Sequence, residues 1–362
     1  MKVAFPYMGD IHLVLEPILR TLGAEVVVPP KPTTETVTIG TQLAPETICL
    51  PFKITLGGML EALKSGADTL VYVTGSWSCR FGYYGRLQAE ILRDLGYRFR
   101  FIELRRDRWQ EIVRAVVELN NGRFSQAVIK AIKALRIGWW KAMTLEKIYQ
   151  EFRETFPLVK STDECHRLLT AIVKEVEKAP TANKLKHISN SARNRLRSLP
   201  KNGRRAVLRI KLIGESYCTI EPFVNFDIIK RLGEMRCVLV PFLTGPRWLG
   251  FHGFRIGKKG IKRIQNAAKN YWRYCVGGED ANSVGQMILA TREGYDGVVH
   301  IHPFACMPST VVQPTLLKIS RDYNIPFLSL SLDEHTSEAG YLTRLEAFIS
   351  LLERKRLLNS KH

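Results

Sequence analysis

Three cysteines lie in loops that we expect at the carboxyl ends of strands. Cys49, Cys79 and Cys306 each follow or adjoin an apolar run and precede a helical pattern. In α/β folds such loops converge at one edge of a parallel sheet, where ligands bind. Three thiolates that meet there could hold an iron–sulfur cluster and leave one iron without a protein ligand. That open iron would make the site a reaction centre rather than a carrier of electrons.

The flanks of these cysteines share a local design. Pro51 stands two residues after Cys49, and Pro308 stands two residues after Cys306. Proline suits the first turn of a helix, because the N–H groups there have no partner within the helix. A cysteine at such a position gains thiolate stability from the helix dipole and from free backbone N–H groups. The same reasoning applies to Cys79, because a helical pattern begins shortly after it.

The other four cysteines have different surroundings. Cys165, Cys237 and Cys275 lie in helical or strand patterns, and we expect them to be small buried hydrophobes. Cys218 lies in the loop after a predicted strand and is a further candidate ligand. No Cys-x-x-Cys pair occurs, which argues against a zinc ribbon, a thioredoxin-like site and a ferredoxin motif. Any metal site must therefore combine distant parts of the chain.

Three polar side chains near the Cys306 loop are candidate catalytic residues. His302 ends the strand before that loop, and Glu334 and His335 follow the next strand, so all three could move protons or tune a cluster. A helix cap or a loop hydrogen bond is the alternative role for Glu334 and His335. We expect His300, which points inward on the strand, to be structural.

Two residues beside Cys79 are candidate substrate-binding residues. Arg80 could neutralise thiolate charge or bind the phosphates of an acyl-CoA. Tyr83 belongs to an aromatic group that could keep water away from a cluster. Ordinary loop packing is the alternative for both residues.

The two ends of the chain alternate strand and helix patterns. At the amino-terminal end, the expected strands are Lys2–Met8, Glu25–Pro29, Thr69–Thr74 and Tyr97–Leu104, and the expected helices are Ile11–Leu22, Pro51–Ser65 and Gly82–Leu95. At the carboxy-terminal end, the expected strands are Arg205–Ile213, Cys237–Phe242, Gly297–His302 and Pro326–Leu332, and the expected helices are Val224–Leu232, Lys258–Tyr274, Ser283–Glu293, Thr310–Tyr323 and Leu342–Leu357. Alternation of this kind indicates parallel sheets that are covered by helices on both faces.

The middle of the chain is helical throughout. Apolar residues recur at helical spacing in Trp109–Leu119, Ser125–Leu135, Leu145–Phe152 and Asp163–Lys178, before a basic stretch at Lys184–Arg205. We therefore predict an α/β fold with two Rossmann-like lobes, residues 1–107 and 205–362, plus a basic, all-helical insertion at residues 108–204. The parallel sheets of the two lobes are expected to face each other across a cleft.

A weak internal repeat supports the two-lobed plan. The distance from Gly66 to Cys79 is thirteen residues, and the distance from Gly294 to Cys306 is twelve. Each stretch contains a buried strand pattern and is followed by a helix pattern and another strand. The repeat predicts that the two lobes offer cysteines from equivalent loops.

The net charge of +20 in a chain of 362 residues is unevenly spread. Eleven Lys or Arg residues and no acid lie between Glu177 and Glu215, and nine more lie between Glu234 and Glu279. Such runs suit phosphates or an acidic protein surface, and a solvated basic face is the alternative. Nucleic-acid binding is not expected, because no corresponding motif accompanies the charge.

We also expect no membrane span and a cytoplasmic location. No apolar stretch approaches the roughly 20 residues of a transmembrane helix. The first residues read as a strand and lack the pattern of a signal peptide.

The loops resemble those of a known family. The resemblance rests on Cys49-Leu-Pro-Phe-Lys, Thr74-Gly-Ser-Trp-Ser-Cys79-Arg-Phe-Gly-Tyr-Tyr, Gly214-Glu-Ser-Tyr…Glu221-Pro-Phe-Val-Asn225, Pro303-Phe-Ala-Cys306-Met-Pro and Asp333-Glu-His-Thr-Ser-Glu-Ala-Gly340. With these motifs the chain resembles the 2-hydroxyacyl-CoA dehydratase and benzoyl-CoA reductase family of iron–sulfur proteins. It is most similar to the branch described as activase-related or predicted nucleotide-binding.

The resemblance implies a cofactor and partners. It assigns Cys49, Cys79 and Cys306 as ligands of a [4Fe–4S] cluster, or of a double-cubane cluster as in some relatives. It implies a separate ATP-hydrolysing activase, of the sugar kinase, heat-shock and actin type, as electron donor, and a dimer of the chain with itself or with a related subunit. The implied activity is reduction or dehydration of a bound substrate such as an acyl-CoA.

Two other functions stay open from the sequence alone. The chain could be a cluster-bearing subunit or scaffold without chemistry of its own, with the basic stretches as its docking face. It could also be a metal-free protein that binds a small anionic molecule between its lobes. Iron separates the first two hypotheses from the third, and turnover with the ATPase present separates the first from the second.

Overall fold

The computed structural model describes residues 1–75, 79–105, 109–203, 208–254 and 258–359. The chain divides into two compact units, which are described separately. Unit 1 comprises Met1–Met143 with Pro180–Ala182, and unit 2 comprises Thr144–Ala179 with Asn183–His362. Among the described helices, each is too short or too polar to cross a lipid bilayer.

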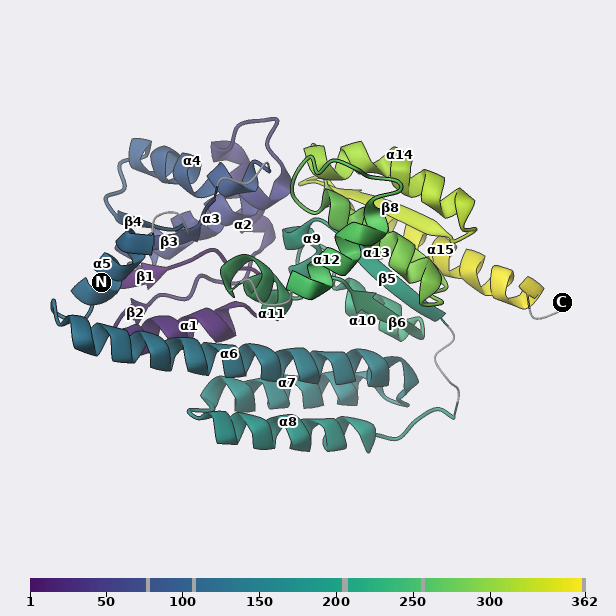
Figure 1. The fold of residues 1–362 in the computed structure, drawn as a ribbon, viewed down its shortest axis with the longest axis horizontal. Coiled ribbons are helices and arrows are strands. Elements are labelled where there is room, and N and C mark those ends of the chain that lie inside the picture. Colours follow the sequence, from purple (N-terminus) through teal and green to yellow (C-terminus); the bar gives the residue numbers. More distant parts are fainter. Residues whose placement is uncertain (76–78, 106–108, 204–207, 255–257, 360–362) are drawn as a thin grey trace. The chain divides into compact units, whose positions relative to one another are not determined.

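Unit 1 contains a four-stranded parallel sheet in the order β2-β1-β3-β4. Its strands are β1 (Lys2–Ala4), β2 (Glu25–Val26), β3 (Thr69–Val73) and β4 (Arg100–Leu104), and its helices are α1 (His12–Leu22), α2 (Thr34–Leu43), α3 (Leu50–Lys64), α4 (Phe81–Asp94), α5 (Trp109–Glu118) and the first part of α6 (Phe124–Thr155). Figure 1 shows these elements with the same labels. The short apolar strands are buried because helices cover both faces of the sheet.

Alternate residues of the strands pack on different helices. Leu70 and Tyr72 of β3 share a buried cluster with residues of α3 and α4, whereas Val71 packs with residues near α1 and α5. Helix α3 is buried on nearly all sides because α2 crosses it at backbone contact. A Cβ atom on Gly57 of α3 would lie 2.1 Å from the backbone oxygen of Thr36 in α2. Only glycine permits this approach, so the helix pair fixes the position of the α3 amino terminus.

Unit 2 repeats the strand arrangement of unit 1. Its parallel sheet has the order β6-β5-β7-β8, formed by β5 (Leu208–Gly214), β6 (Cys237–Pro241), β7 (Gly297–Pro303) and β8 (Phe327–Leu332). In both sheets the second strand flanks the first on one side, and the third and fourth strands follow on the other. The predicted fold class, two Rossmann-like lobes with added helices, is therefore confirmed.

The helices of unit 2 fall into two groups. Those that follow β5 are α9 (Ser216–Ile220), α10 (Ile228–Glu234), α11 (Gly245–Trp248), a π-helical turn (Leu249–Phe254), α12 (Lys258–Ala268), α13 (Asp280–Arg292), α14 (Met307–Asp322) and α15 (Glu338–Asn359). Those that precede β5 are the end of α6, a 3₁₀ turn (Phe156–Leu158), α7 (Thr162–Lys178) and α8 (Ala182–Arg197). Helices α12 to α14 contribute to one buried cluster on the sheet, and α15 packs on the opposite face at Gly297.

Several predicted elements differ from the observed ones. The two helices expected at Ser125–Leu135 and Leu145–Phe152 form one helix, α6, because Gly138 between them packs against Ile18 and keeps the helical conformation. The helix expected at Val224–Leu232 begins only at Ile228, since Asp227 before it has left-handed backbone angles.

Other corrections concern missing helices and domain limits. Helix α2 was not predicted, whereas α8 falls in the middle region that was expected to be helical, and Cys218 lies inside α9 rather than in a loop. The predicted start of a strand at Arg205 lies outside the described residues, as do the predicted domain limits at 107/108 and 204/205. The three-part division and the cleft between the lobes stay predictions.

Candidate functional site

Cys49 forms the N-cap of α3 at the carboxyl edge of the unit 1 sheet. Its backbone is extended (φ −73°, ψ 155°), and its carbonyl oxygen accepts a bond of 3.0 Å from the N–H of Phe52. Pro51 occupies the first turn, and no side-chain hydrogen bond caps the helix. The side chain at this position is instead a thiol that is 9% exposed, at the positive end of the helix dipole.

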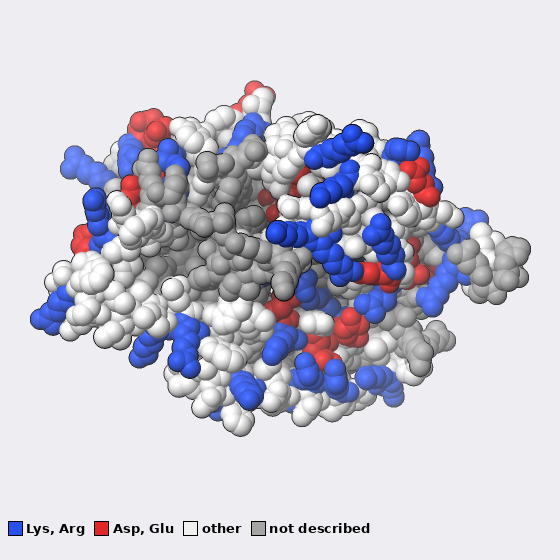
Figure 2. Space-filling view, viewed as in Figure 1, with Lys and Arg blue, Asp and Glu red and all other residues white. Residues whose placement is uncertain are grey.

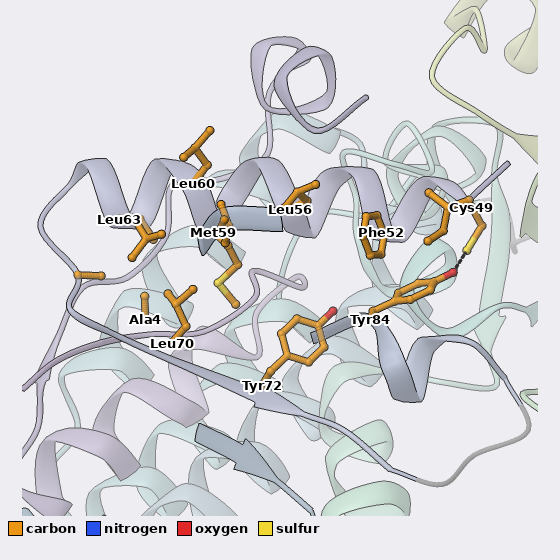
Figure 3. Close-up of a cluster of buried hydrophobic side chains, with 14 residues drawn as sticks. Ala4, Cys49, Phe52, Leu56, Met59, Leu60, Leu63, Leu70, Tyr72 and Tyr84 are labelled. Carbon is orange, nitrogen blue, oxygen red and sulfur yellow. Dashed lines mark hydrogen bonds between the residues drawn. The ribbon is translucent and has the colours of Figure 1, made fainter. Parts of the chain in front are cut away.

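The Tyr84 hydroxyl meets the Cys49 thiol. The phenol oxygen and Sγ are 2.5 Å apart and form a hydrogen bond between α4 and α3 (Figure 3). Burial raises the pKa of Tyr84 above its usual range, and negative charge on Cys49 or Cys79 raises it further, while Arg80 opposes this shift. Because Cys79 leads into α4 and Tyr84 of this helix bonds to Cys49, the turn that carries Cys79 lies near Cys49 in unit 1.

Cys79 is half-buried in the turn that leads into α4. Its carbonyl oxygen accepts a bond from the N–H of Gly82, and the N–H of Tyr83 donates to the Arg80 carbonyl over 2.8 Å. The Arg80 and Tyr83 side chains are both exposed. Both predicted substrate-binding residues therefore present their side chains to solvent, Arg80 directly after Cys79 and Tyr83 in the first turn of α4.

Cys306 is the N-cap of α14 in unit 2, in a setting similar to that of Cys49. Pro308 occupies the first turn, and the Cys306 thiol donates to the Ser309 hydroxyl over 3.3 Å. Ala305 before it has a left-handed backbone with φ 60°, which turns the chain sharply between β7 and α14. Since Cys306 belongs to unit 2, the arrangement of all three cysteines around one cluster stays a prediction.

His302 lies at the end of β7 with partners at both ring nitrogens. Nδ1 is 3.1 Å from the Pro303 carbonyl, so this nitrogen carries the proton and Nε2 accepts. The Gln313 amide lies 2.6 Å from Nε2, and the Ser329 hydroxyl lies 3.3 Å from it. Burial lowers the pKa of His302, which keeps the ring neutral.

The adjacent His300 is completely buried. Its Nδ1 is 3.3 Å from the Ser329 hydroxyl, and its ring lies 4.9 Å from that of His302. Burial lowers the pKa of His300 well below its usual value, and protonation of the neighbouring His302 would lower it further. Its position in the interior agrees with the expected structural role.

Glu334 and His335 lie in the loop between β8 and α15. The Asp333 carboxylate accepts the His335 N–H at 3.0 Å and the Thr336 hydroxyl at 2.8 Å, which fixes the turn. The Glu334 side chain is half-buried, and His335 is exposed. Both residues follow a strand at the same sheet edge as His302 and Cys306, as the sequence predicts.

The sequence indicated Tyr84 only as one of the aromatic residues beside Cys79 and Glu215 only as part of the Gly214-Glu-Ser-Tyr motif, and it did not indicate Glu279. Glu215 caps α9 by accepting the N–H groups of Tyr217 and Cys218, and Glu279 accepts bonds from Ser216 and Asn282. Burial, and then the Glu279 charge, raise the pKa of Glu215. The Gly-Glu-Ser motif at residues 214–216 contains Glu215, but it does not reveal that Glu279 lies beside it.

The remaining cysteines have separate positions. Cys165, Cys218 and Cys237 are buried, and burial raises the pKa of Cys165 and Cys237 to about 12. The expectation of burial was wrong for Cys275, which is exposed after α12 ends early and donates to the Asp280 carboxylate. Within the described residues, no group of three or more His, Cys, Asp or Glu side chains is arranged to hold a metal ion.

The basic stretches are partly neutralised. Figure 2 shows Lys and Arg side chains spread over the face of unit 2 that it presents. On α8, however, Arg193 and Arg197 both pair with Glu151, and Arg195 pairs with Glu175. Exposed ion pairs of this kind contribute little stability, but they reduce the positive field of the stretch.

One comparison with known proteins identifies the family. No curated protein matches the chain. The family model described as 2-hydroxyglutaryl-CoA dehydratase, D-component, matches residues 14–352. That family is a dehydratase component of the 2-hydroxyacyl-CoA dehydratase type, and its name marks it as one part of a system with another component. Because the match covers nearly the whole chain, the protein belongs to the 2-hydroxyglutaryl-CoA dehydratase, D-component family.

Proposed function

We propose that this dehydratase component holds a [4Fe–4S] cluster through Cys49, Cys79 and Cys306 and dehydrates or reduces a bound acyl-CoA. The observation that carries the proposal is that Cys49 begins α3 and Cys79 immediately precedes α4, while Tyr84 of α4 is hydrogen-bonded to the Cys49 thiol. Family membership supports it, because the family is associated with iron–sulfur clusters. A double-cubane cluster is the alternative cofactor.

The donor groups suit such a cluster. Thiolates are the ligands that iron–sulfur clusters use, and Cys49 and Cys306 each lie at the positive end of a helix. Phe52 and Phe81 pack against Tyr84 beside Cys49 and exclude water from that side of the thiol. When bound, the cluster supplies a low-potential electron and an open iron for substrate.

The other predicted residues have roles at the same sheet edges. Arg80, which is exposed beside Cys79, binds phosphate or carboxylate oxygens of the substrate, and Tyr83 contacts its apolar part. His302 is held neutral with its proton on Nδ1, so its Nε2 can accept a proton once Gln313 moves away. Glu334 and His335 move protons at the loop after β8.

The electron donor in this proposal is an ATP-hydrolysing activase. The family name already implies a second component, and the exposed Lys and Arg side chains of unit 2 offer a surface for an acidic partner. A dimer with itself or with a related subunit would shield the open iron from water.

Iron and acid-labile sulfide per chain, measured on anaerobically purified protein, test the proposal. We expect about four of each, with a broad absorption near 400 nm that disappears in air. About eight of each would indicate the double-cubane cluster. Cys49→Ala, Cys79→Ala and Cys306→Ala should each lose the iron, whereas Cys275→Ala should retain it as a matched control. No iron after anaerobic reconstitution would overturn the proposal.

Turnover then separates an enzyme from a scaffold. With the activase, ATP and a 2-hydroxyacyl-CoA present, the loaded protein should release the dehydrated acyl-CoA. A loaded protein that accepts electrons but turns over none of a panel of acyl-CoA substrates would contradict the catalytic part of the proposal.

A further inference from the structure

Tyr84 connects the two helices that carry the unit 1 cysteines. It lies on α4, five residues after Cys79, and its hydroxyl bonds to Sγ of Cys49 at the start of α3 (Figure 3). The side chain is 2% exposed, although its neighbour Tyr83 is 55% exposed. A buried phenol that reaches across to a thiol on another helix has a defined position and a defined partner.

The packing around Tyr84 leaves its ring little freedom. The ring of Phe52 meets it edge to face at 4.9 Å, and that of Phe81 lies 5.6 Å away. Helix α4 is pressed onto β3, since a Cβ atom on Gly85 would lie 2.7 Å from the Tyr72 ring. Such contacts fix the rotamer, so the direction of the hydroxyl toward Cys49 is set before any ligand binds.

The chemistry of the pair changes when Cys49 binds iron. In the free protein either the thiol or the phenol could donate the hydrogen. A thiolate that is bound to iron has no hydrogen and can only accept, so the phenol must donate. A hydrogen bond to a cluster sulfur is one of the factors that set the reduction potential.

We propose that Tyr84 donates a hydrogen bond to the Cys49 sulfur and thereby raises the reduction potential of the cluster. This inference rests on the proposed function, because it requires that Cys49 is a ligand. Reduction adds one negative charge, part of which resides on the sulfur ligands. The donated hydrogen bond is therefore stronger in the reduced state, and it favours that state over the oxidised one.

Tyr84→Phe removes the hydroxyl and keeps the ring that packs on Phe52. We expect the ratio of reduced to oxidised cluster at a fixed solution potential to fall about tenfold, which corresponds to a shift of about 59 mV toward more negative potential for one electron. The measurement is a redox titration of anaerobically loaded protein, followed by visible absorption and electron paramagnetic resonance. Tyr97→Phe, the same change just beyond the carboxyl end of α4, is the matched control and should leave the potential unchanged.

A second variant tests the same hydrogen bond by shifting the reduction potential in the opposite direction. Replacing Tyr84 with 3-fluorotyrosine keeps the hydroxyl and makes it more acidic, so it donates more strongly. The potential should then move to a less negative value than in the wild type. If Tyr84→Phe folds without retaining iron, this variant still tests whether the Tyr84 hydroxyl raises the reduction potential.

The outcomes distinguish this inference from the proposed function. A wild-type protein that binds no iron overturns the proposed function, and this inference with it. A wild-type cluster whose potential is the same in both Tyr84 variants leaves the proposed function standing and overturns the role of Tyr84. Opposite shifts in the two variants, with none in Tyr97→Phe, would establish it.

Discussion

The two sheets share a plan but differ at one helix start. In each unit a helix precedes the third strand, and this helix is α3 in unit 1 and α13 in unit 2. Cys49 caps α3, whereas Glu279 caps α13. In contrast, the loop after the third strand carries a cysteine in both units, Cys79 in one and Cys306 in the other.

The equivalence extends to the backbone. Asp68 accepts the N–H of Lys2 over 2.8 Å, and Asp296 accepts the N–H of Arg209 over 2.7 Å, so each first strand is tied in the same way. A Cβ atom on Gly285 of α13 would lie 2.1 Å from a backbone oxygen of α12, as one on Gly57 would from α2. The units therefore match in their framework.

The difference between the units concerns the ligands that each can offer. At the compared loops, unit 1 provides two thiols beside aromatic rings, and unit 2 provides one thiol, Cys306, together with a carboxylate pair and two histidines. A thiolate is a soft ligand that suits an iron–sulfur cluster, whereas a hydrogen-bonded carboxylate does not compete for that role. Four equivalent loops thus yield three thiols, which is the number that the proposed cluster requires.

Replacing the N-cap residues that differ between the units, Cys49 and Glu279, should give the largest contrast. Cys49→Ser is expected to reduce bound iron from about four atoms per chain to less than one, because serine oxygen is a poor ligand for the cluster. Glu279→Gln should leave the iron content unchanged, since Glu279 already has Ser216 and Asn282 as partners. Loss of iron from Glu279→Gln would show that both N-cap residues contribute to iron binding and would contradict the difference drawn between the units.

The shared helix crossing can be tested by adding a methyl group in each unit. Gly57→Ala and Gly285→Ala should each lower the free energy of unfolding by about 2–4 kcal/mol, because the new Cβ meets backbone. Urea denaturation followed by circular dichroism measures this. Gly58→Ala is the control, since nothing lies within 4 Å of its Cβ; it should stabilise by about 0.5–1 kcal/mol. Equal effects at positions 57 and 58 would refute the close crossing.

The histidines of unit 2 should make its stability depend on pH. The pKa of His300 is depressed by burial, so the unfolded chain binds a proton that the folded chain excludes. Stability is therefore full above the ordinary pKa of about 6.5 and falls as pH decreases, by up to about 1.4 kcal/mol per pH unit for one histidine. Urea titrations at pH 7.5, 6.5 and 5.5 should show this, with a smaller slope in His300→Gln. Parallel slopes in both proteins would contradict it.

The equivalent aspartates Asp68 and Asp296 should have the smallest effect on stability, and the effect should be similar in both units. Asp68→Ala and Asp296→Ala each remove a carboxylate that receives a backbone N–H at the start of a strand. We expect a loss of about 1 kcal/mol in either variant, measured as a change in the urea midpoint. Losses that differ by more than about 1 kcal/mol would indicate that these bonds stabilise the two units unequally despite their similar geometry.

The strands were predictable from the sequence, and several helices were not. Each predicted strand is present, because buried parallel strands have continuous apolar runs. Strands β1, β2 and β4 are shorter than predicted. Helix α2 escaped prediction since its Thr, Val and Ile residues have low helix propensity. Its contact with α3 through Gly40 and Gly57, which lie far apart in sequence, stabilises it instead.

The site was predictable only in part. Prolines two residues after Cys49 and Cys306 indicated helix starts, and both cysteines are N-caps. The contact between Tyr84 and Cys49 spans 35 residues and depends on how α4 packs, so no local pattern contains it. The same holds for Ser329 and Gln313 around His302, because these partners come from different elements.

The cysteine caps have a consequence for how the chain can evolve. At α2 and α7, Thr33 and Ser161 accept backbone N–H groups, whereas Cys49 and Cys306 make no such bond. Serine or aspartate at either position would stabilise the fold by about 1 kcal/mol. A lineage that no longer needed the thiols would therefore gain stability by losing them. Under the proposed function, selection for the cluster ligands offsets this gain and keeps cysteine at both helix starts.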